Sequence, residues 1–132
     1  MSKAVLYAAN TNPQTVVAAG SVVNFGSIVR RYGCNCNLSG GNAIVEGIGY
    51  YAVDANVTFG GTTASTVVVQ LYNDGVAIPG ATATVVIGNN GTGSVTIPTV
   101  VRQRCCVEST ITANITGLAG TVSNASIRVV KL

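Results

Sequence analysis

Residues 49–59 read Gly-Tyr-Tyr-Ala-Val-Asp-Ala-Asn-Val-Thr-Phe, and in an extended chain their side chains point alternately to two faces. One face carries only aromatic and aliphatic groups and is predicted to form the core: Tyr51, Val53, Ala55, Val57 and Phe59. The other face, from Ile48 to Thr58, begins apolar and ends polar. This gradient indicates a strand with one end packed against neighbouring subunits and the other end in solvent.

The same period of two recurs along the whole chain, in runs of Val, Ile, Thr and Ala that are interrupted by Gly, Asn or Asp. Strands are predicted near residues 4–8, 15–18, 21–31, 44–59, 66–72, 76–78, 81–87, 94–101, 106–116 and 121–130. The core between two sheets is predicted to hold Val67, Val69, Leu71 and Ile111 as well. Asp74-Gly75 predicts a tight hairpin, because these residues accept positive φ angles. Since no linker divides the chain, residues 1–132 are expected to form one all-β, antiparallel β-sandwich domain.

Charged residues are scarce in this chain. Hydrophobic residues make up 48% of the 132 residues and charged residues only 8%, compared with about 25% charged residues in an average soluble domain. So few charges cover a monomer's surface poorly, and this favours burial of apolar strand faces against copies of the same chain. We therefore expect a homo-oligomer.

Charge and hydropathy also restrict the partners and the location. The net charge is +3, and the basic residues form no stripe in the sequence, so nucleic acid is not an expected partner. The apolar runs are too short to cross a bilayer, and the first ten residues lack the pattern of a secretory signal. We therefore expect no membrane association. We also expect the chain to be synthesised in a host cytoplasm. Residues 1–13, with Lys3 as their only charged side chain, form either an N-terminal attachment arm or simply the first strand.

The stretch of residues 49–59 resembles the Gly-x-Tyr strand of the C1q and tumour-necrosis-factor superfamily. Residues 69–75, Val-Gln-Leu-Tyr-Asn-Asp-Gly, are similar to the strand and hairpin that follow it there, and residues 125–130 are similar to the short final strand. The resemblance implies a ten-stranded jelly roll that assembles as a compact trimer, with aromatic and aliphatic side chains around the threefold axis. By this resemblance Tyr51 matches the motif tyrosine, and Tyr50, Tyr51 and Tyr72 are assigned to the trimer interface.

The composition departs from the secreted eukaryotic members of that superfamily. Trp is absent and aromatic residues make up 5% of the chain. The bias towards Ala, Thr, Val and Gly, as in residues 75–81, is more similar to bacterial and bacteriophage versions of the fold. Those versions imply a module on a virion surface, at a fibre tip or on a spore coat.

Four cysteines form two pairs, Cys34 with Cys36 and Cys105 with Cys106. One or two disulfides could join the two segments if their Cα atoms lie within about 7 Å. Free, partly buried thiols are the second alternative. A zinc site is the third, but structural zinc sites usually place two to four residues between paired ligands, so no metal is expected.

Each cysteine pair follows two arginines, which are Arg30, Arg31, Arg102 and Arg104. If the two segments meet, these side chains cluster around the thiols. Their positive field is then expected to lower the thiol pKa values and to ease oxidation.

No enzymatic activity and no cofactor are expected. The chain has no histidine, so neither a cysteine nor a serine nucleophile has its usual base. The four carboxylates are Glu46, Asp54, Asp74 and Glu108, and they are explained as turn residues, solvated strand positions or partners of arginines.

The leading hypothesis is therefore a trimeric structural protein of a bacteriophage virion, located at the virion surface and attached to a capsid or other virion protein. A capsid decoration protein or a head-fibre module fits a single domain best. The alternatives are a fibre tip that binds a host receptor or glycan through loops such as 38–42 or 87–93, and a spore-surface protein. The low aromatic content disfavours glycan binding, which usually uses exposed rings.

Overall fold

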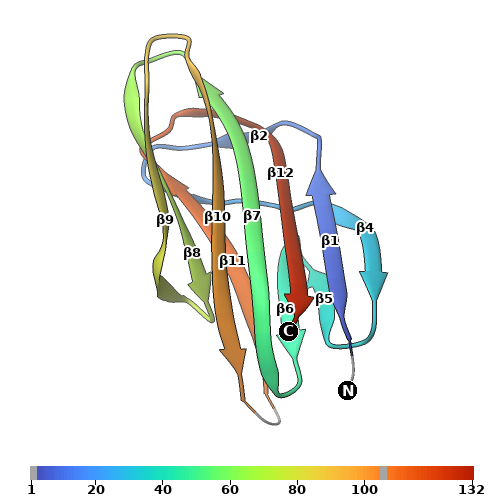
Figure 1. Ribbon diagram of the computed structural model, residues 1–132. Helices are drawn as coiled ribbons and strands as arrows, with labels where there is room; N and C mark the ends of the chain where they lie inside the picture. Colours follow the sequence, from blue (N-terminus) through green and yellow to red (C-terminus); the bar gives the residue numbers. More distant parts are fainter. Residues whose placement is uncertain (1–2, 105–106) are drawn as a thin grey trace.

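A computed structural model describes residues 3–104 and 107–132, which fold into two β-sheets packed face to face (Figure 1). Each strand pairing in these residues is antiparallel, and they contain no helix, so no helical segment could span a membrane. The strands are β1 (Val5–Asn10), β2 (Gln14–Val16), β3 (Ser21–Val22), β4 (Ser27–Tyr32), β5 (Cys36–Ser39), β6 (Asn42–Glu46), β7 (Gly49–Gly61), β8 (Ser65–Asn73), β9 (Val76–Ile87), β10 (Thr92–Gln103), β11 (Glu108–Thr116) and β12 (Gly120–Lys131).

The two sheets interleave segments that are distant in the sequence. Sheet A has the order β10-β7-β12-β1-β4, with β2 paired to β12, and sheet B has the order β5-β6-β11-β8-β9, with β3 paired to β11. Both chain termini lie at the same end of the sandwich, next to the start of β7 (Figure 1). The architecture confirms the predicted all-β sandwich of jelly-roll type.

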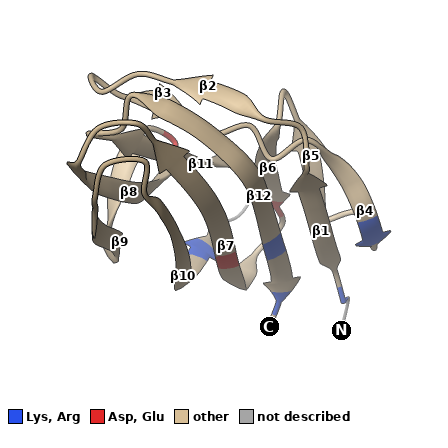
Figure 2. Ribbon diagram, turned by 90° about the horizontal axis from the view of Figure 1, so that it is seen from above, with Lys and Arg blue, Asp and Glu red and all other residues tan. Residues whose placement is uncertain are grey.

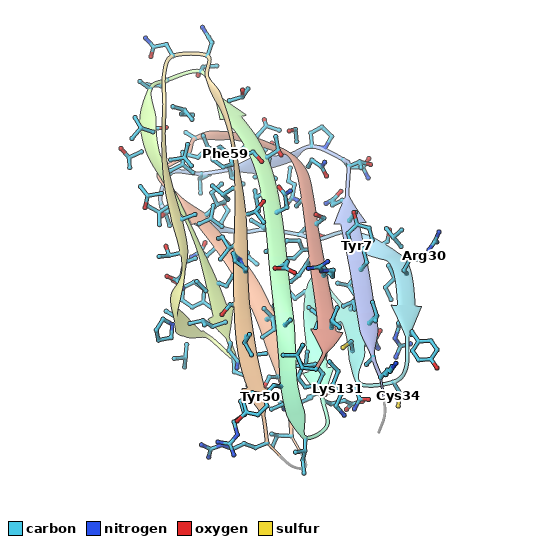
Figure 3. The ribbon with its side chains drawn as sticks, viewed as in Figure 1. Tyr7, Arg30, Cys34, Tyr50, Phe59 and Lys131 are labelled. Atoms are coloured by element: carbon cyan, nitrogen blue, oxygen red, sulfur yellow. The ribbon has the colours of Figure 1, made fainter. Side chains whose placement is uncertain are left out.

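The core lies between the sheets and follows the predicted alternation. In β7, Tyr51, Val53, Ala55, Val57 and Phe59 are at most 1% exposed. The four core residues predicted on the other strands, Val67, Val69, Leu71 and Ile111, are completely buried. Figure 3 shows Phe59 between the layers near the end of the sandwich opposite the termini. Burial of each such side chain stabilises the fold by roughly 1.5–3 kcal/mol.

Glycine breaks two of the predicted strands. The run 44–59 is divided into β6 and β7 at Gly47, whose φ is +95°. The run 21–31 is divided into β3 and β4, and between them Gly26 has a φ of +77°. A Cβ on Gly26 would lie 2.4 Å from the carbonyl oxygen of Ala9, so only glycine allows this close approach.

One expected interruption is absent. The runs 76–78 and 81–87 form a single strand, β9, although Pro79 and Gly80 lie between them. β9 is the edge strand of sheet B, where a proline is tolerated, and Pro79 lies at a break in the register where it has no partner residue on β8. The irregularity appears instead as a register shift opposite Gln70 and Tyr72. The side-chain amide of Gln70 donates to the carbonyl oxygens of Ile78 (2.9 Å) and Ala81 (3.1 Å) across it.

The N-terminal segment belongs to the sandwich. β1 pairs with β12 on one side and with β4 on the other, and Leu6 and Ala8 are completely buried. Residues 5–10 are therefore a strand inside sheet A, and the alternative of a detached attachment arm over residues 1–13 does not describe them.

Candidate assembly surface and cysteine segments

The outer face of sheet A carries a row of apolar side chains that runs across all five strands of the main path. The register aligns Val100 with Ala52, Ala52 with Val130, Val130 with Val5, and Val5 with Tyr32. Val100 is 55% exposed and Tyr32 is 67% exposed. We call these five residues the apolar row. It is a band of aliphatic and aromatic groups on a sheet face that no other part of the described chain covers.

Next to the apolar row, towards the middle of the sheet, lies a row of mixed character. It aligns Pro98, Asp54, Arg128, Tyr7 and Arg30 across the same five strands. The Arg128 guanidinium forms an ion pair with the Asp54 carboxylate, with Nε at 3.0 Å from Oδ2. The aromatic ring of Tyr7 lies between Arg128 and Arg30 in this row, and Tyr7 is 39% exposed.

The part of the face farthest from the termini is polar and uncharged. Asn56 is aligned with Thr96 on one side and with Ser126 on the other. In the next row the hydroxyl oxygens of Thr58 and Ser94 lie 3.3 Å apart. The outer face of β7 therefore changes from apolar to polar along its length, as its sequence predicts.

The structure separates the three tyrosines that the resemblance assigned to a trimer interface. Tyr50 is 53% exposed on the outer face of sheet A, close to the apolar row (Figure 3). Tyr72 is half-buried on β8 of sheet B, where it pairs with Thr112. Tyr51 has no exposed surface, because it points into the core of its own subunit. The interface role assigned to Tyr51 therefore does not agree with its position, and Tyr50 and Tyr72 do not share a surface.

The first cysteine pair lies at the end of the sandwich that holds the termini. Cys34 is exposed and Cys36 is completely buried, and both thiols are free. Cys105 and Cys106 lie outside the described residues. The predicted disulfide between the two segments is not found at either Cys34 or Cys36. Within residues 3–104 and 107–132, no group of three or more Cys, Asp or Glu side chains could hold a metal ion.

The segment of Cys34 nevertheless lies close to Val107 and Glu108. A hollow of about 540 Å³ is lined by Cys34, Asn35 and Glu46 from one side and by Val107 and Glu108 from the other. The side-chain amide of Asn35 donates to the carbonyl oxygen of Glu46 at 2.9 Å, which fixes the loop before β5. The sequence neighbour of Cys106, Val107, thus lines the same hollow as Cys34.

The arginine field acts on Cys36 as predicted, but burial outweighs it. Desolvation raises the pKa of the Cys36 thiol from 9.0 to about 11, while the charges of Arg31 and Lys131 lower it. Arg31 is close enough for its Nε to donate to the carbonyl oxygen of Cys36 at 2.8 Å. The prediction of a lowered thiol pKa is therefore wrong for Cys36, because the thiolate would lose its hydration inside the core.

The carboxylates do not gather into a catalytic pair. Asp54 is held by Arg128, and Asp74 Oδ1 accepts a hydrogen bond of 2.9 Å from the Thr110 backbone N–H. Glu46 and Glu108 stand directly opposite each other on β6 and β11, and both are exposed. Both side chains are open to solvent, so they lack the contrasting surroundings that a catalytic acid and its partner base have.

The loops farthest from the termini form an uncharged hollow of about 410 Å³. Its lining includes glycines, threonines, Asn90 and residue Phe59. This hollow includes part of the loop 87–93 that sequence analysis named as a candidate ligand site. The Phe59 side chain is completely buried, so it offers no exposed ring face for stacking on a sugar.

No protein-family model and no curated protein match this chain. Among solved structures, it is similar to crystal structures of murine APRIL at pH 8.5, pH 5.0 and pH 8.0, with TM-scores of 0.72, 0.74 and 0.70. In each comparison the sequence identity is 19%, and the match covers 99% of this chain and 100% of the other. At this identity the likeness concerns the fold alone. The chain therefore has the fold of a tumour-necrosis-factor-like jelly-roll domain.

Proposed function

We propose that this chain is a non-enzymatic structural module that works as a homotrimer on a bacteriophage virion. Its simplest role is that of a capsid decoration protein or a head-fibre module attached to another virion protein. The observation that carries the trimer is the apolar row on the outer face of sheet A. A second copy of the chain is the occupant that the composition favours, because 8% charged residues leave the monomer short of solvating groups.

The arrangement of sheet A supports a one-sided contact. The apolar row and Tyr50 lie towards one end of the face, and the other end carries hydroxyl and amide groups that water can solvate. Subunits that meet through the apolar end bury Val100 and Tyr32 and leave Asn56 and its neighbours hydrated. Aromatic and aliphatic side chains at the centre with a polar rim are the usual anatomy of a stable interface.

The virion assignment rests on composition. The Ala, Thr, Val and Gly bias is similar to bacteriophage versions of the fold, and a decoration protein needs little more than one stable domain and a surface for attachment. A receptor-binding tip is less well supported, since the uncharged hollow at the 87–93 loop has no exposed aromatic ring.

Light scattering of the purified protein tests the trimer. We expect three times the subunit mass at micromolar concentration, and we expect Val100→Asp to give a folded monomer. Val22→Asp is the matched control, because Val22 is 59% exposed on β3 of sheet B, away from the apolar row. If the wild-type protein were a monomer at this concentration, the proposed trimer would be wrong. Electron cryo-microscopy of virions that contain the chain tests the location, and its absence from the particle surface would exclude the decoration role.

A further inference from the structure

The main paths of the two sheets end in four edge strands, and β4 is the one that is least protected. The other three are blocked in ways that are common at sheet edges. β10 has Pro98 in its middle, β9 has Pro79 at a break in its register, and β5 has only four residues. β4 has six residues, contains neither Pro nor Gly, and is exposed at every position. It is therefore the edge best suited to accept another strand.

Only one side of β4 is paired. Its partner is β1, with Arg30 aligned with Tyr7 and Tyr32 aligned with Val5. In the described part of the chain, residues 27–32 make no backbone hydrogen bond to a turn or loop and pair with no other strand. The backbone groups that point away from β1 lie in the plane of sheet A, whereas the apolar row lies on its face. The free edge of β4 and the apolar row are thus different surfaces.

The free edge is basic. Arg30 and Arg31 are adjacent, and the backbone of Lys3 packs against Gly33, which follows β4 directly: a Cβ on Gly33 would collide with the Lys3 carbonyl oxygen. Figure 2 shows this end of β4 in blue at the margin of the molecule. Among the residues that the structure describes, neither Arg30 nor Arg31 has a carboxylate within ion-pair distance. The positive charge of β4 is therefore left for a partner to neutralise.

β4 also exposes apolar side chains. Ile28, Val29 and Tyr32 are large hydrophobic residues, and all three are exposed. Val29 has no partner residue on β1, because the register shifts between Tyr7 and Ala8. A partner strand that carries β-branched side chains would cover these groups. The chemistry of the edge thus combines apolar contact with positive charge.

A second copy of β4 does not fit this edge. Antiparallel pairing of two β4 strands over their full length places four guanidinium groups close together, and like charges on paired strands are destabilising. An added strand with acidic side chains meets the opposite situation, because each carboxylate gains a guanidinium that has no other partner.

We propose that β4 accepts an extended segment of another protein, which adds a sixth strand to the main path of sheet A and places two neighbouring carboxylates against Arg30 and Arg31. Backbone hydrogen bonds to β4 supply the affinity, and the charges set the register of the added strand. This inference rests on the proposed attachment to another virion protein, for which it names the surface and the chemistry of the partner.

The probe is a short peptide, acetyl-Thr-Val-Glu-Glu-Val-Val-Thr-amide. In an antiparallel register its two glutamates lie opposite Arg31 and Arg30, and its charges keep it soluble. One control peptide has Lys in place of both Glu residues, which tests the charge. The other has Pro in place of the two adjacent Val residues. Because N–H groups alternate in direction along a strand, one of these prolines removes an N–H that faces β4.

Nuclear magnetic resonance titration of the isotopically labelled protein locates and measures binding. In about 20 mM NaCl we expect the amide signals of residues 27–32 to shift and their hydrogen exchange to slow, with a dissociation constant of about 1 mM or below. Both control peptides should bind at least about tenfold more weakly, and so should the probe in about 500 mM NaCl.

Two protein variants separate the edge of β4 from positive charge in general. Arg30→Glu should weaken binding of the probe by about tenfold or more; its guanidinium donates only to the carbonyl oxygen of Val29, its neighbour. Arg102→Glu is the matched control, because Arg102 is also exposed and without a carboxylate within ion-pair distance in the described chain, but lies on β10 at the opposite edge of sheet A. It should bind the probe as the wild type does. Circular dichroism verifies that both variants are folded.

The inference is overturned if the probe leaves residues 27–32 unchanged at several times about 1 mM, or if its shifts map to another surface. It is also overturned if either control peptide binds as well as the probe, or if Arg30→Glu has no effect. Each of these results leaves the trimer and the virion location to their own tests. Conversely, a chain that binds the probe at β4 but is absent from the particle surface retains the strand-accepting edge and loses the virion assignment.

Discussion

The hydroxyl of Tyr51 lies 2.7 Å from the carbonyl oxygen of Glu46 and 2.9 Å from that of Gly47. Its single proton is therefore shared by two carbonyl groups in the connection between β6 and β7. Burial raises the pKa of this hydroxyl above its ordinary value, so it remains a proton donor at neutral pH. The motif tyrosine therefore serves the fold of one subunit, and the proposed assembly surface consists of the apolar row and Tyr50.

Replacing Tyr51 by Phe should lower the free energy of unfolding by about 1–3 kcal/mol, because the Gly47 carbonyl loses this donor and the Glu46 carbonyl keeps only that of Asn35, while the ring still fills the core. Urea denaturation measures the change. Tyr50→Phe is the control, since Tyr50 is exposed and the change removes only its hydroxyl. If Tyr51→Phe left the stability unchanged but abolished the trimer, Tyr51 would have to be assigned to the interface.

The core was predictable from sequence because alternation is a local property. Once Tyr51 and Phe59 are placed inward, the period of two fixes the residues between them. The ends of strands were less predictable. The sequence does not show that Gly47 ends a strand, because its positive φ is a property of the folded backbone. Nor does it show that β9 lies at the edge of a sheet, which is the reason why Pro79 is tolerated there.

The candidate site depended on tertiary arrangement. Tyr50 and Tyr72 were assigned to one interface, but β7 and β8 belong to different sheets, so their outward faces point in opposite directions. The basic residues look scattered in the sequence, and only the pairing of β1 with β12 and β4 places Arg128 and Arg30 in one row. Burial likewise decided the pKa of Cys36, and local sequence does not reveal burial.

Replacing Phe59 by Ala should destabilise the protein by about 3–5 kcal/mol, because the ring is completely buried and its loss leaves a cavity. Gly93 packs directly against this ring, where a Cβ would lie 2.9 Å from Phe59 Cε1. Val86→Ala is the control, since Val86 is 77% exposed and should change stability by less than about 0.5 kcal/mol. Similar losses for the two variants in a urea titration would contradict the assignment of the core.

Gly117→Ala should be strongly destabilising. Its φ is +82°, and an added Cβ would lie 2.1 Å from the carbonyl oxygen of Thr66. Gly88→Ala provides the comparison, because Gly88 has no positive φ and nothing lies within 4 Å of its added Cβ. We expect a clear fall in melting temperature for the first variant and almost none for the second. Equal melting temperatures would mean that the turn between β11 and β12 is not packed on β8.

Thiol labelling should distinguish the two cysteines of the first pair. In the native protein Cys34 should react with iodoacetamide at neutral pH and Cys36 should not, because Cys34 is exposed and Cys36 is buried with a raised pKa. Peptide mass spectrometry locates the label, and labelling in urea is the positive control for Cys36. Failure of Cys34 to react in unreduced protein, with recovery after reduction, would restore a disulfide at that position.

The raised pKa of Cys36 predicts that stability falls at alkaline pH. The thiol titrates near 9.0 when the chain is unfolded and near 11 when it is folded, so the unfolded state loses its proton first. Below pH 9 both states keep the proton and stability is unaffected. Between pH 9 and 11 ionisation favours the unfolded chain, and the free energy of unfolding decreases. Tyr51 acts in the same direction, since burial raises its pKa too.

Urea titrations of the wild type and of Cys36→Ala across this pH range isolate the effect of the thiol: the variant should lose less stability than the wild type. Parallel curves would show that Cys36 ionises as easily in the folded protein as in the unfolded chain, and thus that it is open to water.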